Sequence, residues 1–357
     1  ALRSTFRKYK AMFRLARRLS APLSRSRSAA LREIGTAFGA VDEPGHPRGL
    51  TRIAGSLRRL QGSWTLLLDF FYMHSAKSLW FLNKRFQRDR ARIAHLSGAL
   101  AELDVHLALA QSALGWKDGY ALPDILDRAA ARLKIEQGHQ PFLLKQGGSV
   151  PNDAELTLEM DRQTGVNFAV LTGVNAGGKS TYLSMLSLLT ILAQIGAPVP
   201  AKSMELTPLH LMTSIVVNQN LAKGDSFFVA EGKRMLEIIQ AAKSRKDLLA
   251  IFDEILLGTN PEERMALEHS LIPYLARTAN LFMLSTHDLK MTKLEGRVPG
   301  VGNVHVDPDK PYTISPGPSR TRNAIDTVEK IGFPDEIVDD ARRYLKDHPV
   351  ENEDDAP

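Results

Sequence analysis

The sequence predicts an α/β fold of the P-loop nucleotide-binding type, preceded by an all-α domain. A glycine-rich phosphate-binding pattern stands between an apolar run and a stretch with helical character. Two further apolar runs end in polar residues, as buried parallel strands do. The first third is rich in Leu, Ala and Arg. We therefore expect a basic helical domain over 1–128, an α/β domain over 129–346 and an acidic, disordered tail over 347–357.

The phosphate-binding pattern covers residues 173–180, GVNAGGKS, and fits G-x-x-x-x-G-K-[ST] at every fixed position. The apolar residues 168–171 precede it, and the helix-like residues 182–193 follow it. Glycines allow the backbone to wrap around a phosphate, and a helix N-terminus favours an anion. In such a loop the lysine reaches the β- and γ-phosphates, and the Ser hydroxyl ligates Mg²⁺. The residues expected to contact the nucleotide are Gly173, Gly177, Gly178, Lys179 and Ser180.

Two more apolar runs predict the rest of this site. Residues 248–252 form a continuous apolar stretch that ends in Asp253 and Glu254. One carboxylate at such a strand end can hold Mg²⁺, and its neighbour can polarise water for attack on a γ-phosphate. The run over 281–284 leads to His287, which is placed to sense that phosphate. Taken alone, a single histidine is more often a surface or helix-capping residue.

As a set, these segments resemble the ATPase domain of the MutS mismatch-repair family. The sequence TGVNAGGKSTY is similar to the family's TGxNxGGKST[YF], DEILLGTN to DExxxGT[SND], and STH to [AS]TH. Weaker similarities surround them, and the resemblance covers roughly residues 100 to 345. The further matching segments are residues 101–105, 138–141, 150–153, 195–201, 219–226 and 323–334.

The resemblance implies an ABC-type nucleotide fold that uses ATP and Mg²⁺ and forms a homodimer. Each nucleotide site would be completed by Ser226 of the second copy, acting in trans. Glu254 would be the catalytic carboxylate, and His287 would be the switch residue. Asn175 and Thr181 would join the nucleotide contacts, while Ser180 and Asp253 would hold the metal.

The chain departs from the family pattern at several positions. The family often has an adenine-stacking aromatic before V-P-N-D, where this chain has Ser149. Gln140, the pair at 227–228 and the pair at 256–257 also differ from the pattern. None of these changes removes a predicted triphosphate or metal ligand, so we expect ATP hydrolysis.

Charge is unevenly distributed along the chain. Residues 1–128 contain 22 Lys/Arg and 10 Asp/Glu, a net charge of +12, whereas the remainder carries −6. A basic half suggests a polyanionic partner, and we expect DNA binding through residues 1–128. The first 32 residues have ten basic and no acidic side chains, which also fits a solvated basic helix or an organelle transit sequence.

The absence of cysteine excludes disulfides and is compatible with a cytoplasmic protein, and no stretch of the sequence predicts a membrane span. The sequence FDE at 252–254 is its single Phe-x-Glu, and it belongs to the predicted metal strand. We therefore expect a short MutS-like protein without a mismatch-reading domain. Its function would be DNA-associated ATP hydrolysis, in which ATP closes a dimer and moves helical arms on DNA. An ATP-gated protein-interaction module and a nucleotide-binding scaffold without turnover remain alternatives, and the protein partner is unknown.

Overall fold

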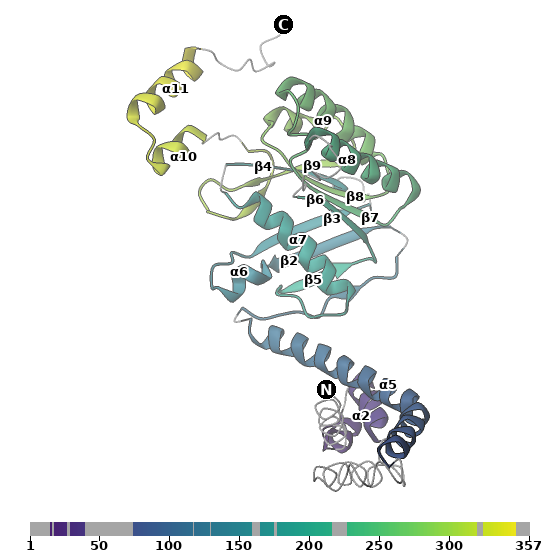
Figure 1. Ribbon diagram of the computed structural model, residues 1–357. Helices are drawn as coiled ribbons and strands as arrows, with labels where there is room; N and C mark the ends of the chain where they lie inside the picture. Colours follow the sequence, from purple (N-terminus) through teal and green to yellow (C-terminus); the bar gives the residue numbers. More distant parts are fainter. Residues whose placement is uncertain are drawn as a thin grey trace. The chain divides into compact units, whose positions relative to one another are not determined.

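Figure 1 shows the computed structural model of the chain. It divides into two compact units, Ala1–Gln111 and Ser112–Pro357. Asn175, Ser226, most of the N-terminal basic segment and the acidic tail from residue 348 lie outside the described residues. The structure describes residue 15 and residues 18–26, 29–39, 74–116, 118–128, 130–158, 165–174, 177–215, 227–319 and 324–347.

The described residues of the first unit are largely helical. They include α2 (Ala29–Gly39) and most of α5 (His74–Leu114), both of which lie within the range 1–128 predicted to be helical. A small buried cluster contains Ile34 of α2 together with Leu96, Ala99 and Leu103 of α5. The three α5 residues are spaced by three and four positions, so they share one face of the helix.

A six-stranded sheet forms the centre of the second unit. Every neighbouring pair from β9 to β6 is parallel, and β10 pairs antiparallel with β9. The three apolar runs predicted as strands are adjacent in it as β4, β8 and β7. In spatial order, the strands are β10 (Ile314–Pro316), β9 (Val301–Val306), β4 (Phe168–Thr172), β8 (Leu281–Ser285), β7 (Leu248–Asp253) and β6 (His210–Ser214).

A second, four-stranded sheet was not predicted. Its order is β1 (Asp124–Ile125), β5 (Ser203–Leu206), β2 (Arg132–Gly138) and β3 (Asn152–Thr157). Strand β2 is antiparallel to both of its neighbours, and β1 is parallel to β5. The domain boundary at residue 128 stays a prediction, although β1 lies before it and already pairs within this sheet.

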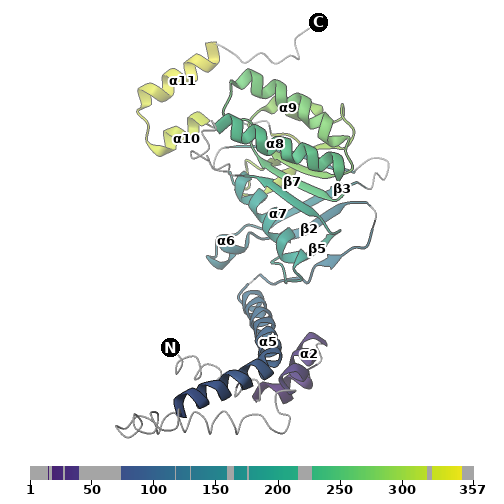
Figure 2. The same ribbon diagram turned by 45° about the vertical axis from the view of Figure 1, so that its right-hand side comes forward.

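Helices cover both faces of the six-stranded sheet. On one face, α7 (Lys179–Gln194) shares a buried core with this sheet and with the four-stranded sheet. On the other face, α8 (Phe227–Ser244) and α9 (Pro261–Ala276) lie side by side, as Figure 2 shows. The strands between them are buried on both faces, which explains their continuous apolar sequences.

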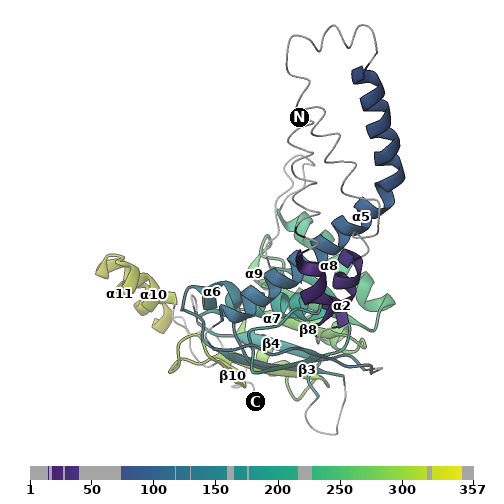
Figure 3. The same cartoon turned by 90° about the horizontal axis from the view of Figure 1, so that it is seen from below.

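The described C-terminal residues form a pair of helices, α10 (Ala324–Ile331) and α11 (Asp335–Asp347), visible in Figure 3. Arg342 of α11 joins them through ion pairs to Asp326 and Glu329 of α10. Among the helices that the structure describes, none is long and apolar enough to cross a membrane.

Candidate functional site

The chain turns from β4 into α7 at the predicted phosphate-binding loop, and two glycines permit this turn. Gly173 has φ +142°, and Gly178, the N-cap of α7, has φ +98°. A Cβ atom on Gly173 would lie 2.7 Å from Cβ of Val306, so a side chain there would clash with β9. The glycines therefore allow a left-handed backbone and close packing just before the N-terminus of α7. Ser180 and Thr181 follow with exposed side chains on the first turn of that helix.

Lys179 is held inside this loop. Its side chain is buried, and Nζ donates hydrogen bonds to the carbonyls of Gly173 at 3.0 Å and Val174 at 3.3 Å. Burial lowers the pKa of Lys179 below its ordinary value, whereas the nearby Glu254 and Asp253 raise it. An ammonium has three N–H donors, so the third can be donated either to Nε2 of His287, 3.3 Å away, or to an anion at the loop.

The predicted acidic pair lies two strands away from β4, at the end of β7. Asp253 accepts a hydrogen bond from the hydroxyl of Ser285, which ends the intervening strand β8. The amide of Glu254 donates to the carbonyl of the same serine at 3.1 Å, and Glu254 has φ +56°. Strand pairing and these two bonds bring the pair to the edge where β4 and β8 also end.

His287 stands between the lysine and the glutamate. Its Nε2 atom is 3.1 Å from Oε1 of Glu254 and 3.3 Å from Nζ of Lys179. A protonated Nε2 donates to the carboxylate, whereas an unprotonated Nε2 accepts from the ammonium, so one atom cannot do both. The hydrogen bond from His287 is the main cause that holds the pKa of Glu254 below its ordinary value, against the effect of burial. The structure thus brings together three of the predicted site residues.

Two buried glutamates near this site were missed by the sequence analysis. Glu268 of α9 accepts a hydrogen bond at 3.1 Å from the hydroxyl of Thr286, the residue directly before His287. Burial raises the pKa of Glu268 to about 7. Glu231 of α8 accepts from the amides of Leu257 and Gly258 at 3.2 and 3.0 Å. It thereby fixes the segment that follows Glu254. Neither glutamate carried a sequence signal, because a single glutamate in an amphipathic helix normally marks its exposed face.

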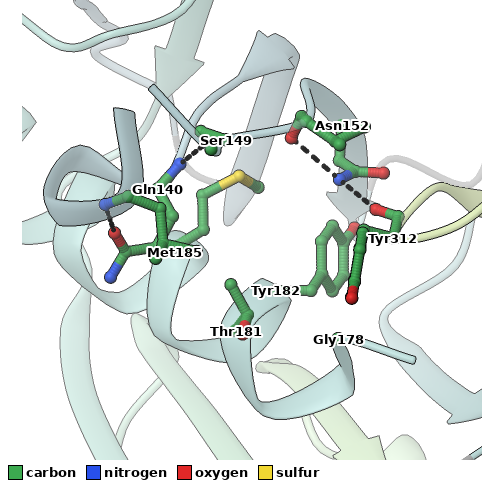
Figure 4. A pocket seen from close by; sticks show the side chains of 11 residues that line it. Gln140, Ser149, Asn152, Gly178, Thr181, Tyr182, Met185 and Tyr312 are labelled. Carbon is green, nitrogen blue, oxygen red and sulfur yellow. Dashed lines mark hydrogen bonds between the residues drawn. The ribbon is translucent and has the colours of Figure 1, made fainter. Parts of the chain in front are cut away.

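A cavity of about 310 Å³ adjoins the start of α7. Figure 4 shows Tyr312 and Tyr182 on one side of it, and Gln140 and Met185 on the other. Ser149, which replaces the aromatic expected from the resemblance, also lines this cavity. Its Oγ accepts a hydrogen bond from the amide of Gln140 at 3.1 Å.

The donors expected to hold Mg²⁺ are few. Within the part of the chain that the structure describes, no group of three or more His, Cys, Asp or Glu side chains is placed to hold a metal ion. Mg²⁺ at phosphate sites takes one or two carboxylates and completes its shell with phosphate oxygens and water. The hydroxyl of Ser180 and the carboxylate of Asp253 fit that limited donor set.

Fold and site together define an α/β protein with a mostly parallel sheet, at one edge of which lie a buried lysine, a glycine-containing loop and an acidic pair. The MutS domain V family matches residues 169–348. The DNA mismatch repair protein MutS of Thermus caldophilus is 32% identical over 273 residues, which cover 74% of this chain and 31% of that protein. The protein of the same name from Exiguobacterium sp. (strain ATCC BAA-1283 / AT1b) is 34% identical over 284 residues, covering 74% and 32%. The chain belongs to the MutS family, and it spans about a third of the length of these relatives.

Proposed function

We propose that this chain binds ATP with Mg²⁺ and hydrolyses it, as the nucleotide-dependent part of a DNA-associated protein of the MutS family. The observation that carries the proposal is the convergence of Lys179, Glu254 and His287 within hydrogen-bonding distance at one sheet edge. The fold would be a P-loop fold of the ABC type, with the basic, largely helical segment within residues 1–128 as a lever domain.

Each residue has a distinct role in this proposal. The remaining N–H of Lys179 and the first amides of α7 bind the phosphates, because both offer positive charge at the loop. Ser180 and Asp253 would hold Mg²⁺, which would supply positive charge next to the phosphates. The carboxylate of Glu254 orients the attacking water and accepts its proton as a general base. Nε2 of His287 lies within hydrogen-bonding distance of both Glu254 and Lys179. A γ-phosphate that bound at Lys179 would therefore change the hydrogen bond between His287 and Glu254.

The assembly part of the proposal goes further. Two copies would form a homodimer, in which Asn175 and Thr181 of one copy and Ser226 of the other complete each nucleotide site. ATP binding would close the dimer and reposition the helical arms on DNA. The names of the relatives support a link to mismatch repair and DNA, and the net charge of +12 on residues 1–128 supports a polyanionic partner.

The decisive experiment is a measurement of ATP turnover by the whole chain with Mg²⁺, alone and with single-stranded, duplex and branched DNA. We expect turnover that depends on Mg²⁺ and changes with DNA. Lys179→Ala should lose nucleotide binding, whereas Lys202→Ala, at an exposed lysine of the same unit, should not. If the wild-type chain neither binds nor hydrolyses ATP, the proposed function is wrong.

A further inference from the structure

Glu268 lies on the buried face of α9, outside the short motifs that resemble the MutS family. It is 1% exposed, and its Oε2 atom accepts a hydrogen bond from the hydroxyl of Thr286 at 3.1 Å. Acidic side chains are almost never fully buried unless they are paired. The contact with Thr286 therefore accounts for the position of this carboxyl group inside the domain.

Thr286 holds the turn that carries His287. Its amide donates to the carbonyl of Leu171 in β4 at 3.0 Å, so the start of the turn is fixed to the strand before the phosphate-binding loop. Its hydroxyl donates to Glu268, and the hydroxyl oxygen accepts from the amide of Asp288 at 3.1 Å. A hydroxyl has one proton and two lone pairs, so both bonds can form together. The residues before and after His287 are thereby joined through one hydroxyl group.

The placement of the His287 ring depends on this turn. Its Nε2 atom lies 3.1 Å from Oε1 of Glu254 and 3.3 Å from Nζ of Lys179. Hydrogen bonds weaken steeply as their geometry departs from the optimum, so a small movement of the ring would alter both contacts. The side chain of His287 is 39% exposed, so packing surrounds only part of it. The backbone that Thr286 holds is therefore a main support of the ring.

We propose that Glu268 is a positioning residue for ATP hydrolysis, which acts through the hydroxyl of Thr286 on the turn that carries His287. This inference rests on the proposed function, because it assigns Glu268 to the reaction proposed for that site. It adds a residue that is too buried to contact the nucleotide itself, and it makes the arrangement of the site depend on the proton that Glu268 holds.

The charges around Glu268 decide how that proton acts. Burial raises the pKa of Glu268 to about 7. The hydrogen bond from Thr286 and the positive charge of Arg264, on the same helix, oppose this rise. The negative charges of Asp288 and Glu254 add to it. Loss of the proton as the pH rises through 7 therefore places an unfavourable buried charge beside Thr286, and the turn is then held less firmly.

Two variants test whether the acceptor at position 268 is needed. Glu268→Leu removes the acceptor of the Thr286 hydroxyl and should lower kcat about 10-fold, the factor that corresponds to one lost hydrogen bond. It should leave KM for ATP unchanged, because the phosphate-binding loop is untouched. Glu268→Gln retains an acceptor and should have the kcat of the wild type near pH 6. Glu263→Gln, at an exposed position of the same helix, serves as the matched control.

The pH profile separates positioning from a merely structural role. The ratio of kcat in Glu268→Gln to kcat in the wild type should rise from about 1 near pH 6 to about 3 near pH 8, because the variant has no carboxyl group to ionise. The same ratio for Glu263→Gln should stay constant. A constant ratio for Glu268→Gln would overturn the inference, and this comparison holds even if Glu268→Leu does not fold.

A double-mutant cycle tests the path through Thr286. Glu268→Leu combined with Thr286→Val should lower kcat no more than Thr286→Val alone, because both changes break the same hydrogen bond. Hydrogen exchange in the nucleotide-free protein gives a readout without turnover. The amide of Asp288 should exchange faster in either single variant than in the wild type, because the hydroxyl that accepts from it is lost or no longer held.

The outcomes distinguish this inference from the proposed function. If the wild type hydrolyses ATP and Glu268→Leu has the same kcat, or if the two losses in the cycle add, this inference alone is wrong. Unchanged exchange of the Asp288 amide in Glu268→Leu would contradict it as well. If the wild type does not hydrolyse ATP, the proposed function is overturned together with it.

Discussion

The imidazole Nε2 of His287 lies 3.1 Å from Oε1 of Glu254, and this contact joins the ends of two neighbouring strands. Glu254 follows β7 and His287 follows β8, so a movement of either side chain alters the hydrogen bond that joins the two strand ends. The same Nε2 is 3.3 Å from Nζ of Lys179, which follows β4. One nitrogen atom therefore links all three strand ends that surround the proposed phosphate site.

The first prediction concerns the chemical role of Glu254. Glu254→Gln should keep ATP binding and reduce turnover on the order of 100-fold, because an amide cannot accept the proton of the attacking water. Single-turnover hydrolysis and equilibrium ATP binding measure the two effects separately. Glu262→Gln, at an exposed position on the first turn of α9, controls for the loss of one negative charge. Wild-type turnover in Glu254→Gln would remove this residue from the mechanism.

The second prediction concerns Glu231, which holds the segment after Glu254 against α8. A Cβ atom on Gly258 would lie 2.8 Å from the amide nitrogen of Phe228, so the segment packs tightly on the first turn of that helix. Glu231→Ala leaves two amide donors without their acceptor, and it should lower the free energy of unfolding by about 2 kcal/mol. Glu237→Ala, which breaks an exposed ion pair with Arg234, should cost less than about 1 kcal/mol. Urea unfolding tests this order, and equal losses in both variants would contradict it.

The third prediction concerns the pH dependence of stability through Glu268. Burial raises its pKa to about 7 from 4.5, with Asp288 and Glu254 adding to the rise and Thr286 and Arg264 opposing it. The folded state then holds a proton between pH 4.5 and 7 that the unfolded state has lost. The contribution of protonated Glu268 to the free energy of unfolding is therefore fully present below pH 4.5. It is lost as the pH rises through 7, a change on the order of 3 kcal/mol.

Glu268→Gln should remove this dependence, because an amide stays neutral and still accepts from Thr286. Unfolding by urea at pH 5 and pH 8 measures the difference in stability between the variant and the wild type. That difference should favour the variant more at pH 8. Glu263→Gln, on the exposed side of α9, should show the same difference at both pH values. A pH-independent difference for Glu268→Gln would mean that the carboxyl titrates normally.

Much of the core of the site was predictable because it depends on local patterns. Three continuous apolar runs predicted the strands, and residues directly after them predicted that Lys179, Glu254 and His287 meet at one edge. The missed features depend on partners that are distant in the sequence. Glu268 meets Thr286 across 18 positions, and Asn152 meets Tyr312 across 160. The four-stranded sheet did have a local signal, since Leu133 and Ile135 alternate with charged residues in β2.

The fourth prediction concerns the proposed homodimer, in which each site would be built from both copies. Ser226→Arg should abolish hydrolysis and leave ATP binding to the single chain intact, because in the proposed dimer the altered side chain would lie in the site of the other copy. Lys179→Ala removes the phosphate-binding lysine, which belongs to the half of the site that each copy supplies for its own nucleotide. Mixing the two variants should restore part of the activity, since one of the two sites is then assembled from intact halves. Light scattering during turnover provides the second measurement, and full activity in a strictly monomeric protein would contradict the composite site.

The fifth prediction places the DNA contact on α5. Arg85, Arg88 and Arg92 are spaced by three and four residues on this helix, so their positions fall along one face. A row of arginines can follow a phosphate backbone, and phosphate contacts give affinity that falls steeply with salt and depends little on sequence. Changing all three to Glu should weaken binding to duplex and single-stranded DNA uniformly and leave basal ATP turnover unchanged.

The matched control makes the same charge change in the other unit. Lys246, Arg297 and Lys330 are exposed, and their replacement by Glu alters the net charge by the same amount. If the control loses as much DNA affinity as the α5 variant, net charge rather than the α5 face governs binding. If the α5 variant binds DNA as the wild type does at about 50 mM salt, the contact lies elsewhere. A reduced salt slope in the α5 variant alone would locate the phosphate contacts on this face, because each lost contact removes about one unit from that slope.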